Sequence, residues 1–204
     1  PLKVALFGDS ISVGSNATGY SGGFPYMPSW GRLFVNRLQD EFGSDVALTN
    51  KSMGGQVSAW GAANAGLVAA EQPDLVLITF GMNDGTFQVP PAAFESNVKS
   101  IMDDVRAVNA DAEFILVATT LAREGVCADA ACATVFAGNQ ADYKAALDRL
   151  ADAYDGTVVM DMTAVHQELL QHKDFLDMTA NNVNHPNDYL VRWYAQYASA
   201  LLIP

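Results

Sequence analysis

Five short apolar runs alternate with longer stretches of helical character along the chain. The runs have the length of buried strands; they are Leu2–Phe7, Val46–Thr49, Leu75–Phe80, Phe114–Thr119 and Val158–Met160. Continuous apolar runs of this length are typical of parallel strands that are covered on both faces. The pattern therefore predicts an α/β fold in which helices cover both faces of a parallel sheet.

The stretches between the runs predict five helices, at 30–42, 57–70, 91–105, 141–154 and 188–202. Two segments, 12–29 and 121–138, have no regular pattern and are expected to be long loops, which are commonly functional. The 204 residues contain no visible repeat or linker. A single domain over 1–204 is therefore expected.

Composition and charge narrow the function classes. Half of the residues are hydrophobic and 17% are charged, as in a globular protein, and no apolar run reaches the roughly 18 residues of a membrane span. The net charge of -12 argues against nucleic acid or an anionic membrane as a partner. The oligomeric state and the source are not visible in the sequence. The sequence opens at Pro1 directly into a strand-like run with no signal peptide visible, so we expect a cytoplasmic protein or a mature or trimmed chain whose leader is gone.

The two cysteines, Cys127 and Cys132, lie close together in the second long loop. They are too few for a metal site, and no histidine is near them in sequence, so no metal is expected. Their spacing favours a local disulfide, with two unrelated thiols as the alternative. A disulfide would in turn favour a secreted or periplasmic protein. No cofactor motif is visible either.

Residues suited to acyl transfer follow the predicted strands. Ser10 follows the first run, 50–55 follow the second, Asn83 follows the third and His185 precedes the last helix. Turns after parallel strands meet at one edge of the sheet, so these residues are expected to converge there. Histidine can accept the proton of a serine nucleophile. Glycine N–H groups and an asparagine amide can stabilise the oxyanion of a tetrahedral intermediate.

Four short blocks occur in a characteristic order: Gly8-Asp9-Ser10, Asn50–Gly55, Gly81–Asp84 and Asn184–Asn187. Together they resemble the SGNH (GDSL-type) hydrolase family. The resemblance implies a flavodoxin-like three-layer α/β/α sandwich with a five-stranded parallel sheet. It also implies that Ser10 is the nucleophile and first oxyanion donor, that Gly55 (or Gly54) and Asn83 are further donors, and that His185 is the base. Asp9 and Asp84 are expected to be structural.

The chain departs from the family pattern before His185. The pattern is Asp-x-x-His, whereas Asn182 stands three residues before His185. An asparagine cannot stabilise an imidazolium by charge. We therefore expect a Ser–His dyad that is oriented by a main-chain carbonyl or by the Asn182 amide oxygen. Asp188 is the alternative orienting carboxylate unless it caps the last helix, and Asp177 is a remoter candidate. The remaining histidines, His166 and His172, are expected to be exposed.

The segment after the nucleophile contains four aromatic residues: Tyr20, Phe24, Tyr26 and Trp30. They would stack on a sugar or line an acyl pocket, or they would pack the loop onto the body of the protein. No lid-like apolar helix is visible. The lack of such a helix favours a short, acetyl-type acyl group, and the acidic composition disfavours anionic lipid substrates. Together they favour hydrolysis of an acetyl-type ester on a small molecule or neutral carbohydrate. The alternatives are a lipase- or thioesterase-type acyl hydrolase of the same family and a non-catalytic carbohydrate-binding module on the same fold.

Overall fold

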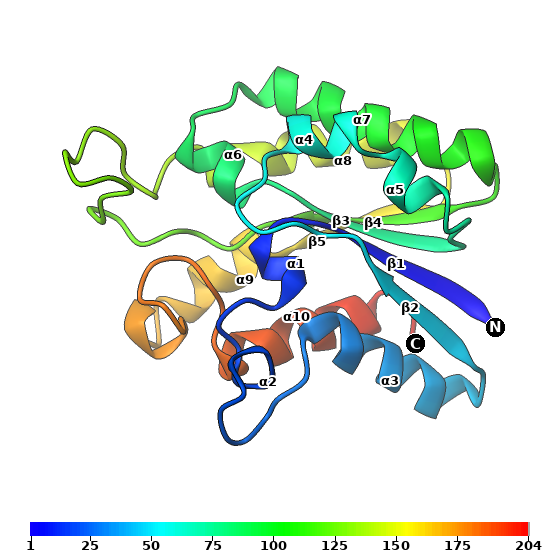
Figure 1. Cartoon of the computed structure of the whole chain (residues 1–204), viewed down its shortest axis with the longest axis horizontal. Coiled ribbons are helices and arrows are strands. Elements are labelled where there is room, and N and C mark those ends of the chain that lie inside the picture. Colours follow the sequence, from blue (N-terminus) through cyan, green and yellow to red (C-terminus); the bar gives the residue numbers. More distant parts are fainter. Residues whose placement is uncertain (204) are drawn as a thin grey trace.

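A five-stranded parallel sheet forms the centre of the molecule, in a computed structural model that describes residues 1–203 (Figure 1). The strand order is β2-β1-β3-β4-β5. The strands are β1 (Leu2–Gly8), β2 (Val46–Asn50), β3 (Leu75–Thr79), β4 (Glu113–Ala118) and β5 (Thr157–Asp161). The predicted sheet is confirmed, and each strand begins and ends within about one residue of its apolar run, as expected at strand ends.

Helices cover both faces of the sheet, as the α/β pattern predicts (Figure 1). The larger helices on one face are α3 (Trp30–Phe42), α9 (Met162–Leu169) and α10 (Asp188–Ala200). Those on the other face are α4 (Ser58–Ala63), α5 (Gly66–Ala69), α7 (Pro91–Val108) and α8 (Lys144–Ala153). Three short helices follow strand ends or lie in loops: α1 (Ser10–Val13), α2 (Thr18–Ser21) and α6 (Met82–Thr86). Two 3₁₀ turns, at Gln140–Tyr143 and Phe175–Asp177, complete the elements. No helix within residues 1–203 is both long and apolar enough to cross a bilayer.

Two hydrophobic cores share the sheet. On β1, Leu6 packs into the core that contains α3 and α10, while Phe7 packs into the core that contains α4, α5 and α7. Successive side chains of a strand point to opposite faces. Because both faces are covered, nearly every position in a central strand is apolar, which explains the apolar runs.

The segment predicted as one helix over 57–70 is two short helices, α4 and α5. The side-chain amide of Asn64 donates to the Trp60 carbonyl at 2.8 Å. That carbonyl is the acceptor that the Asn64 N–H would use in a continuous helix. The alanine-rich composition indicated the helical propensity but not this interruption.

The other boundaries differ less. The last two predicted helices are shorter than expected: 141–143 belong to a 3₁₀ turn, α8 ends at Ala153 and α10 ends at Ala200. The first predicted loop contains the second half of α1 and all of α2, and each of these helices ends at a glycine with a left-handed backbone. Helices of four residues are too short to produce a periodic pattern.

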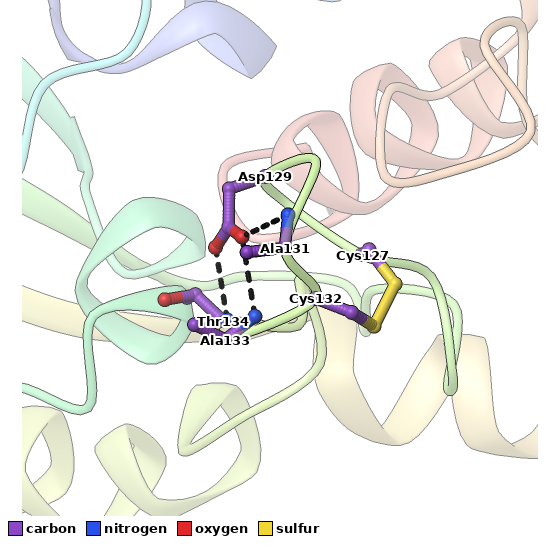
Figure 2. Close-up of a disulfide and its surroundings, with 6 residues drawn as sticks. All are labelled: Cys127, Asp129, Ala131, Cys132, Ala133 and Thr134. Carbon is purple, nitrogen blue, oxygen red and sulfur yellow. Dashed lines mark hydrogen bonds between the residues drawn. A yellow bond between two sulfur atoms is a disulfide. The ribbon is translucent and has the colours of Figure 1, made fainter.

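The second predicted loop, over 121–138, projects from the body of the protein (Figure 1). Its tip contains a Cys127–Cys132 disulfide. The Asp129 carboxylate accepts hydrogen bonds from the N–H groups of Ala131, Ala133 and Thr134 at 2.9–3.1 Å, as Figure 2 shows. The tip is therefore organised by local contacts.

The strand order reverses direction between β1 and β3. The chain leaves β1 toward β2 on one side and later returns to form β3 on the other side. In open α/β sheets this reversal leaves a crevice at the carboxyl ends of the two central strands, where ligands bind. Helix α1 begins two residues after β1 ends, and α6 follows β3. Both short helices therefore begin at the crevice.

Candidate active site

Ser10 and His185 meet at this crevice. The Nε2 atom of His185 lies 2.9 Å from the Oγ atom of Ser10, across 175 residues of sequence. Ser10 is the first residue of α1, and its side chain keeps a small exposed fraction of 7%. The hydroxyl is thus within hydrogen-bond reach of an imidazole that can accept its proton.

The glycine of the first block allows β1 and β3 to approach closely. A Cβ atom on Gly8 would lie 2.6 Å from the Thr79 carbonyl oxygen, which no side chain could tolerate. Immediately after Gly8, the Asp9 carboxylate accepts from the Ile11 N–H at 2.9 Å and caps α1. These two residues place Ser10 at the first position of α1, at the carboxyl end of β1.

The second block lies against Ser10. The Met53 N–H donates to the Gly8 carbonyl at 3.0 Å, and a Cβ atom on Gly54 would lie 3.8 Å from the Ser10 Cβ. Gly55 has a φ of 78°, in the left-handed region, and a Cβ atom there would meet no atom within 4 Å. The structure thus brings Gly54 next to Ser10, and Gly55 adjoins it in the same turn.

Asn83 of the third block contacts the residue that directly follows the second block. Its Nδ2 atom donates to the Gln56 carbonyl at 3.0 Å. The neighbouring Asp84 carboxylate accepts from the Ser58 N–H at 2.9 and 3.0 Å and from its hydroxyl at 2.5 Å. Asp84 therefore joins α6 to α4, which is the structural role expected of it.

Two buried carboxyls behind the site have raised pKa values. The pKa of Asp9 is raised to about 7, chiefly by burial and to a smaller extent by the negative charge of Asp84. Burial also raises the pKa of Asp84. Neither carboxyl bonds to His185, so both support the site without taking part in the Ser10–His185 contact.

His185 lies on a compact turn that Asn181 organises. The Asn181 Oδ1 atom accepts from three successive N–H groups, those of Val183, Asn184 and His185, each at 3.0 Å. Asn182 is exposed with a φ of 60°, and its side chain makes no hydrogen bond to His185. The expectation that Asn182 orients the imidazole is therefore wrong, because its side chain leaves the turn toward solvent.

The second imidazole nitrogen contacts a residue that the sequence analysis missed. The Nδ1 atom of His185 forms a short hydrogen bond with the Oδ1 atom of Asn16. Asn16 lies between α1 and α2, 169 residues from His185, and no sequence pattern there indicates a partner for a histidine. Its closeness in sequence to Ser10 is the one signal that could have pointed to it.

The two carboxylates considered as partners of His185 bind elsewhere. Asp188 accepts from the N–H of Thr18 at 2.9 Å and from its hydroxyl at 2.5 Å. It is the first residue of α10, and from there its side chain reaches the loop that contains Thr18 and not the imidazole. The carboxylate of Asp177 lies 3.6 Å from Lys173. Asn187, and not Asp188, caps α10.

Burial lowers the pKa of His185. The imidazole is therefore neutral at neutral pH, the state in which it can accept a proton.

Three of the four loop aromatics are exposed and one is buried. Tyr20, Phe24 and Tyr26 are exposed, Phe24 to 86%. Trp30 is fully buried; its Nε1 atom donates to the Ile11 carbonyl at 3.1 Å, and its ring lies 5.5 Å from that of Tyr194. Trp30 therefore cannot bind substrate, because α3 packs against α10 and encloses it.

His166 is also buried, contrary to expectation. Its Nδ1 atom accepts from the Leu121 N–H at 3.0 Å, and burial lowers its pKa to about 4. It lies on the face of α9 that packs against the body of the protein, where a neutral imidazole can replace an apolar side chain. His172 is exposed, beside Glu168.

The chain resembles known proteins in sequence and in fold. The sequence pattern of the GDSL-like lipase/acylhydrolase family matches residues 6–190. Esterase TesA of Pseudomonas aeruginosa is 38% identical over 106 residues, which are 52% of this chain and 49% of the relative. The arylesterase of Vibrio mimicus is 33% identical over 105 residues, which are 51% of this chain and 48% of the relative. The chain thus spans about half the length of the curated relatives it matches.

Among solved structures, a crystal structure of TesA superposes with a TM-score of 0.68 at 25% identity. The superposition covers 99% of this chain and 98% of that one. The likeness in fold therefore extends over nearly the whole chain.

Proposed function

The chain belongs to the GDSL-like lipase/acylhydrolase family, and on that premise we propose that it is a serine esterase that hydrolyses short-chain carboxylic esters. Ser10 is the proposed nucleophile and His185 the general base. The observation that carries the proposal is the 2.9 Å contact between the His185 Nε2 atom and the Ser10 Oγ atom. A serine is a weak nucleophile until a neighbouring base accepts its proton, and this contact supplies the base.

The proposed reaction has two halves. The Ser10 Oγ atom attacks the ester carbonyl carbon while its proton moves to His185 Nε2, and the imidazolium then protonates the departing alcohol. Water attacks the resulting acyl-serine, gives its proton to Nε2, and the carboxylic acid leaves as that proton returns to Ser10 Oγ. The lowered pKa of His185 supports the first step, because the imidazole begins neutral.

Three donors are proposed for the oxyanion: the N–H groups of Ser10 and Gly55 and the amide of Asn83. Ser10 is the first residue of α1, so its N–H has no acceptor within the helix. Asn83 uses one N–H toward Gln56 and has a second available. Loss of one such donor costs about 10²–10³-fold in kcat in serine hydrolases.

The proposed substrate is an acetyl-type ester on a neutral carbohydrate. Its support is the exposed aromatic group Tyr20, Phe24 and Tyr26, which lies in the loop that also contains Asn16. Exposed aromatic faces suit stacking on sugar rings. The net charge of -12 disfavours anionic substrates. The Cys127–Cys132 disulfide supports an oxidising, secreted or periplasmic location.

A second candidate is an acyl hydrolase for longer chains. Met53 in the second block and Phe87, directly after α6, are exposed apolar side chains close in sequence to the proposed oxyanion donors. Such side chains could pack against an acyl chain that extends from the crevice.

A p-nitrophenyl ester series tests both candidates. We expect Ser10→Ala to lose at least about 10³-fold in kcat on the acetate, while Ser44→Ala, which changes an exposed serine beyond α3, keeps the wild-type rate. We also expect acetate to be preferred to octanoate. Equal rates for the wild type and Ser10→Ala would remove Ser10 as nucleophile and favour a carbohydrate-binding role. A preference for octanoate would favour the second candidate.

A further inference from the structure

We propose that Asn16 is the positioning residue of His185 and that it replaces, with a neutral amide from a different segment, the aspartate of the Asp-x-x-His pattern. The inference rests on the proposed function in so far as His185 acts as a base. The contact between Asn16 and His185 can be tested by NMR, without a measurement of enzymatic activity.

The imidazole of His185 is held at both nitrogens by residues close together in sequence. Nε2 faces Ser10 Oγ at 2.9 Å, and Nδ1 forms the short hydrogen bond with Asn16 Oδ1. An amide oxygen can only accept a hydrogen bond, so this contact places the imidazole proton on Nδ1. The lone pair of Nε2 is then directed at the Ser10 hydroxyl. An amide N–H against Nδ1 would leave the proton on Nε2, where the imidazole could not act as a base.

The backbone of Asn16 suits an asparagine. Its φ is 67°, in the left-handed region that asparagine, aspartate and glycine tolerate better than other residues. Substitutions by glycine and aspartate therefore change the side chain with little added backbone strain, whereas alanine would add strain.

The segment around Asn16 is fastened to the helix that follows His185. Thr18 donates its N–H and its hydroxyl to the Asp188 carboxylate at 2.9 and 2.5 Å, and the Met27 N–H donates to the Thr18 hydroxyl at 2.9 Å. Between Asn16 and Thr18, Ala17 is buried. Asp188 therefore acts indirectly. It binds Thr18 and so fixes the segment that places Asn16 against the imidazole.

The carboxylates on the elements around the crevice are engaged elsewhere. Asp9 caps α1 through Ile11, Asp84 on α6 binds Ser58, and Asp188 on α10 binds Thr18. Within residues 1–203, Asn16 and Ser10 are the residues whose side chains hydrogen-bond to the His185 side chain. The imidazolium that forms during turnover is thus stabilised by an amide dipole and not by a carboxylate charge.

Titration of His185 by NMR is the direct test. The chain contains three histidines, and a His185→Gln spectrum identifies the relevant signal. We expect Asn16→Asp to raise the pKa of His185 by about 1, because an adjacent carboxylate favours the charged imidazolium. The matched control is Asn182→Asp, which introduces the same charge three residues before His185 on a side chain that does not contact it. This control should leave the pKa nearly unchanged.

Kinetics of the same variants give the second readout. We expect Asn16→Gly to lower kcat on p-nitrophenyl acetate by about 10- to 100-fold with little change in KM, because the imidazole loses its preferred tautomer and orientation. Asn16→Asp should restore most of the rate and move the acid limb of the kcat/KM profile to higher pH. Unfolding midpoints of the variants separate this loss from misfolding.

Failure of the inference about Asn16 and failure of the proposed function give different results. The inference is overturned if Asn16→Asp leaves the pKa of His185 unchanged, or if Asn182→Asp raises it equally. It is also overturned if a folded Asn16→Gly keeps the wild-type kcat. An inactive wild type would overturn the proposed function instead, and the NMR titration would still decide the contact.

Discussion

Asp9 is a buried carboxyl next to the proposed nucleophile, and its ionisation couples the site to pH. Its pKa is raised from 3.8 to about 7, chiefly by burial. The folded state therefore binds this proton more tightly than the unfolded state between about pH 4 and pH 7. The stabilisation from the protonated carboxyl is present below pH 4 and declines as the pH rises toward 7.

We expect Asp9→Asn to remove this pH dependence. Asparagine keeps an oxygen for the Ile11 N–H and cannot ionise. The free energy of unfolding of the variant, relative to wild type, should therefore increase by a few kcal/mol between pH 4.5 and pH 8, measured by urea unfolding at each pH.

Asp40→Asn, at an exposed position on α3, serves as the control and should show no such trend. A constant difference between Asp9→Asn and wild type over this pH range would mean that Asp9 ionises normally.

At the scale of the elements, the aromatic residues around the site are of two kinds, buried and exposed. Trp30 begins α3 and joins it to α10 through Tyr194 and to α1 through the Ile11 carbonyl. Phe24 lies in the preceding loop with 86% of its surface exposed. The first residue therefore maintains the packing between helices, whereas the second is available to a ligand.

We expect variants of these two residues to separate stability from substrate binding. Trp30→Phe loses a buried hydrogen bond and some packing, which should cost about 1–3 kcal/mol in unfolding free energy with KM nearly unchanged. Phe24→Ala should leave stability unchanged and raise KM for an acetylated oligosaccharide. Urea unfolding and steady-state kinetics measure the two effects.

Phe42→Ala, which removes another exposed aromatic at the end of α3, is the control for Phe24→Ala. An unchanged KM in Phe24→Ala would argue against stacking of a sugar on this loop.

At the scale of the whole molecule, the protein carries a net charge of -12. The sequence contains 23 acidic and 11 basic residues. Like charges repel one another, and this repulsion opposes the compact state. Ion pairs such as Lys99–Asp103, in which both side chains are exposed, contribute little to stability.

We therefore expect the unfolding temperature to rise by a few degrees when NaCl is increased from about 0.01 M to about 0.15 M, because the Debye length falls from about 30 Å to about 8 Å. Over the same range, KM for a negatively charged ester should fall while KM for the neutral p-nitrophenyl acetate stays constant. A calorimetric scan and matched kinetics at each salt concentration measure both quantities. Salt-independent unfolding would show that the acidic groups are too dispersed to repel one another strongly.

Much of the fold was predictable from the pattern of apolar residues along short stretches of the sequence. The apolar runs marked all five strands because a strand covered on both faces must be apolar at nearly every position. The blocks at Ser10, Asn83 and His185 were recognisable because each follows a strand or precedes a helix, and parallel topology brings such positions together. The interruption at Asn64 was not predictable from propensity, because it depends on one side chain that competes for a backbone carbonyl.

The sequence was sufficient for features that depend on neighbouring residues: the strands, the layered architecture and the placement of the blocks that contain Ser10 and His185 after a strand or before a helix. The tertiary structure was required wherever the choice lay between partners distant in sequence. It paired His185 with Asn16 and not with Asn182 or Asp188, and it buried Trp30 and His166. The physical reason is that an aromatic ring, an imidazole or an amide is compatible with either solvent or a partner. Packing between α3, α9, α10 and the loop after α1 decides which of these each residue meets.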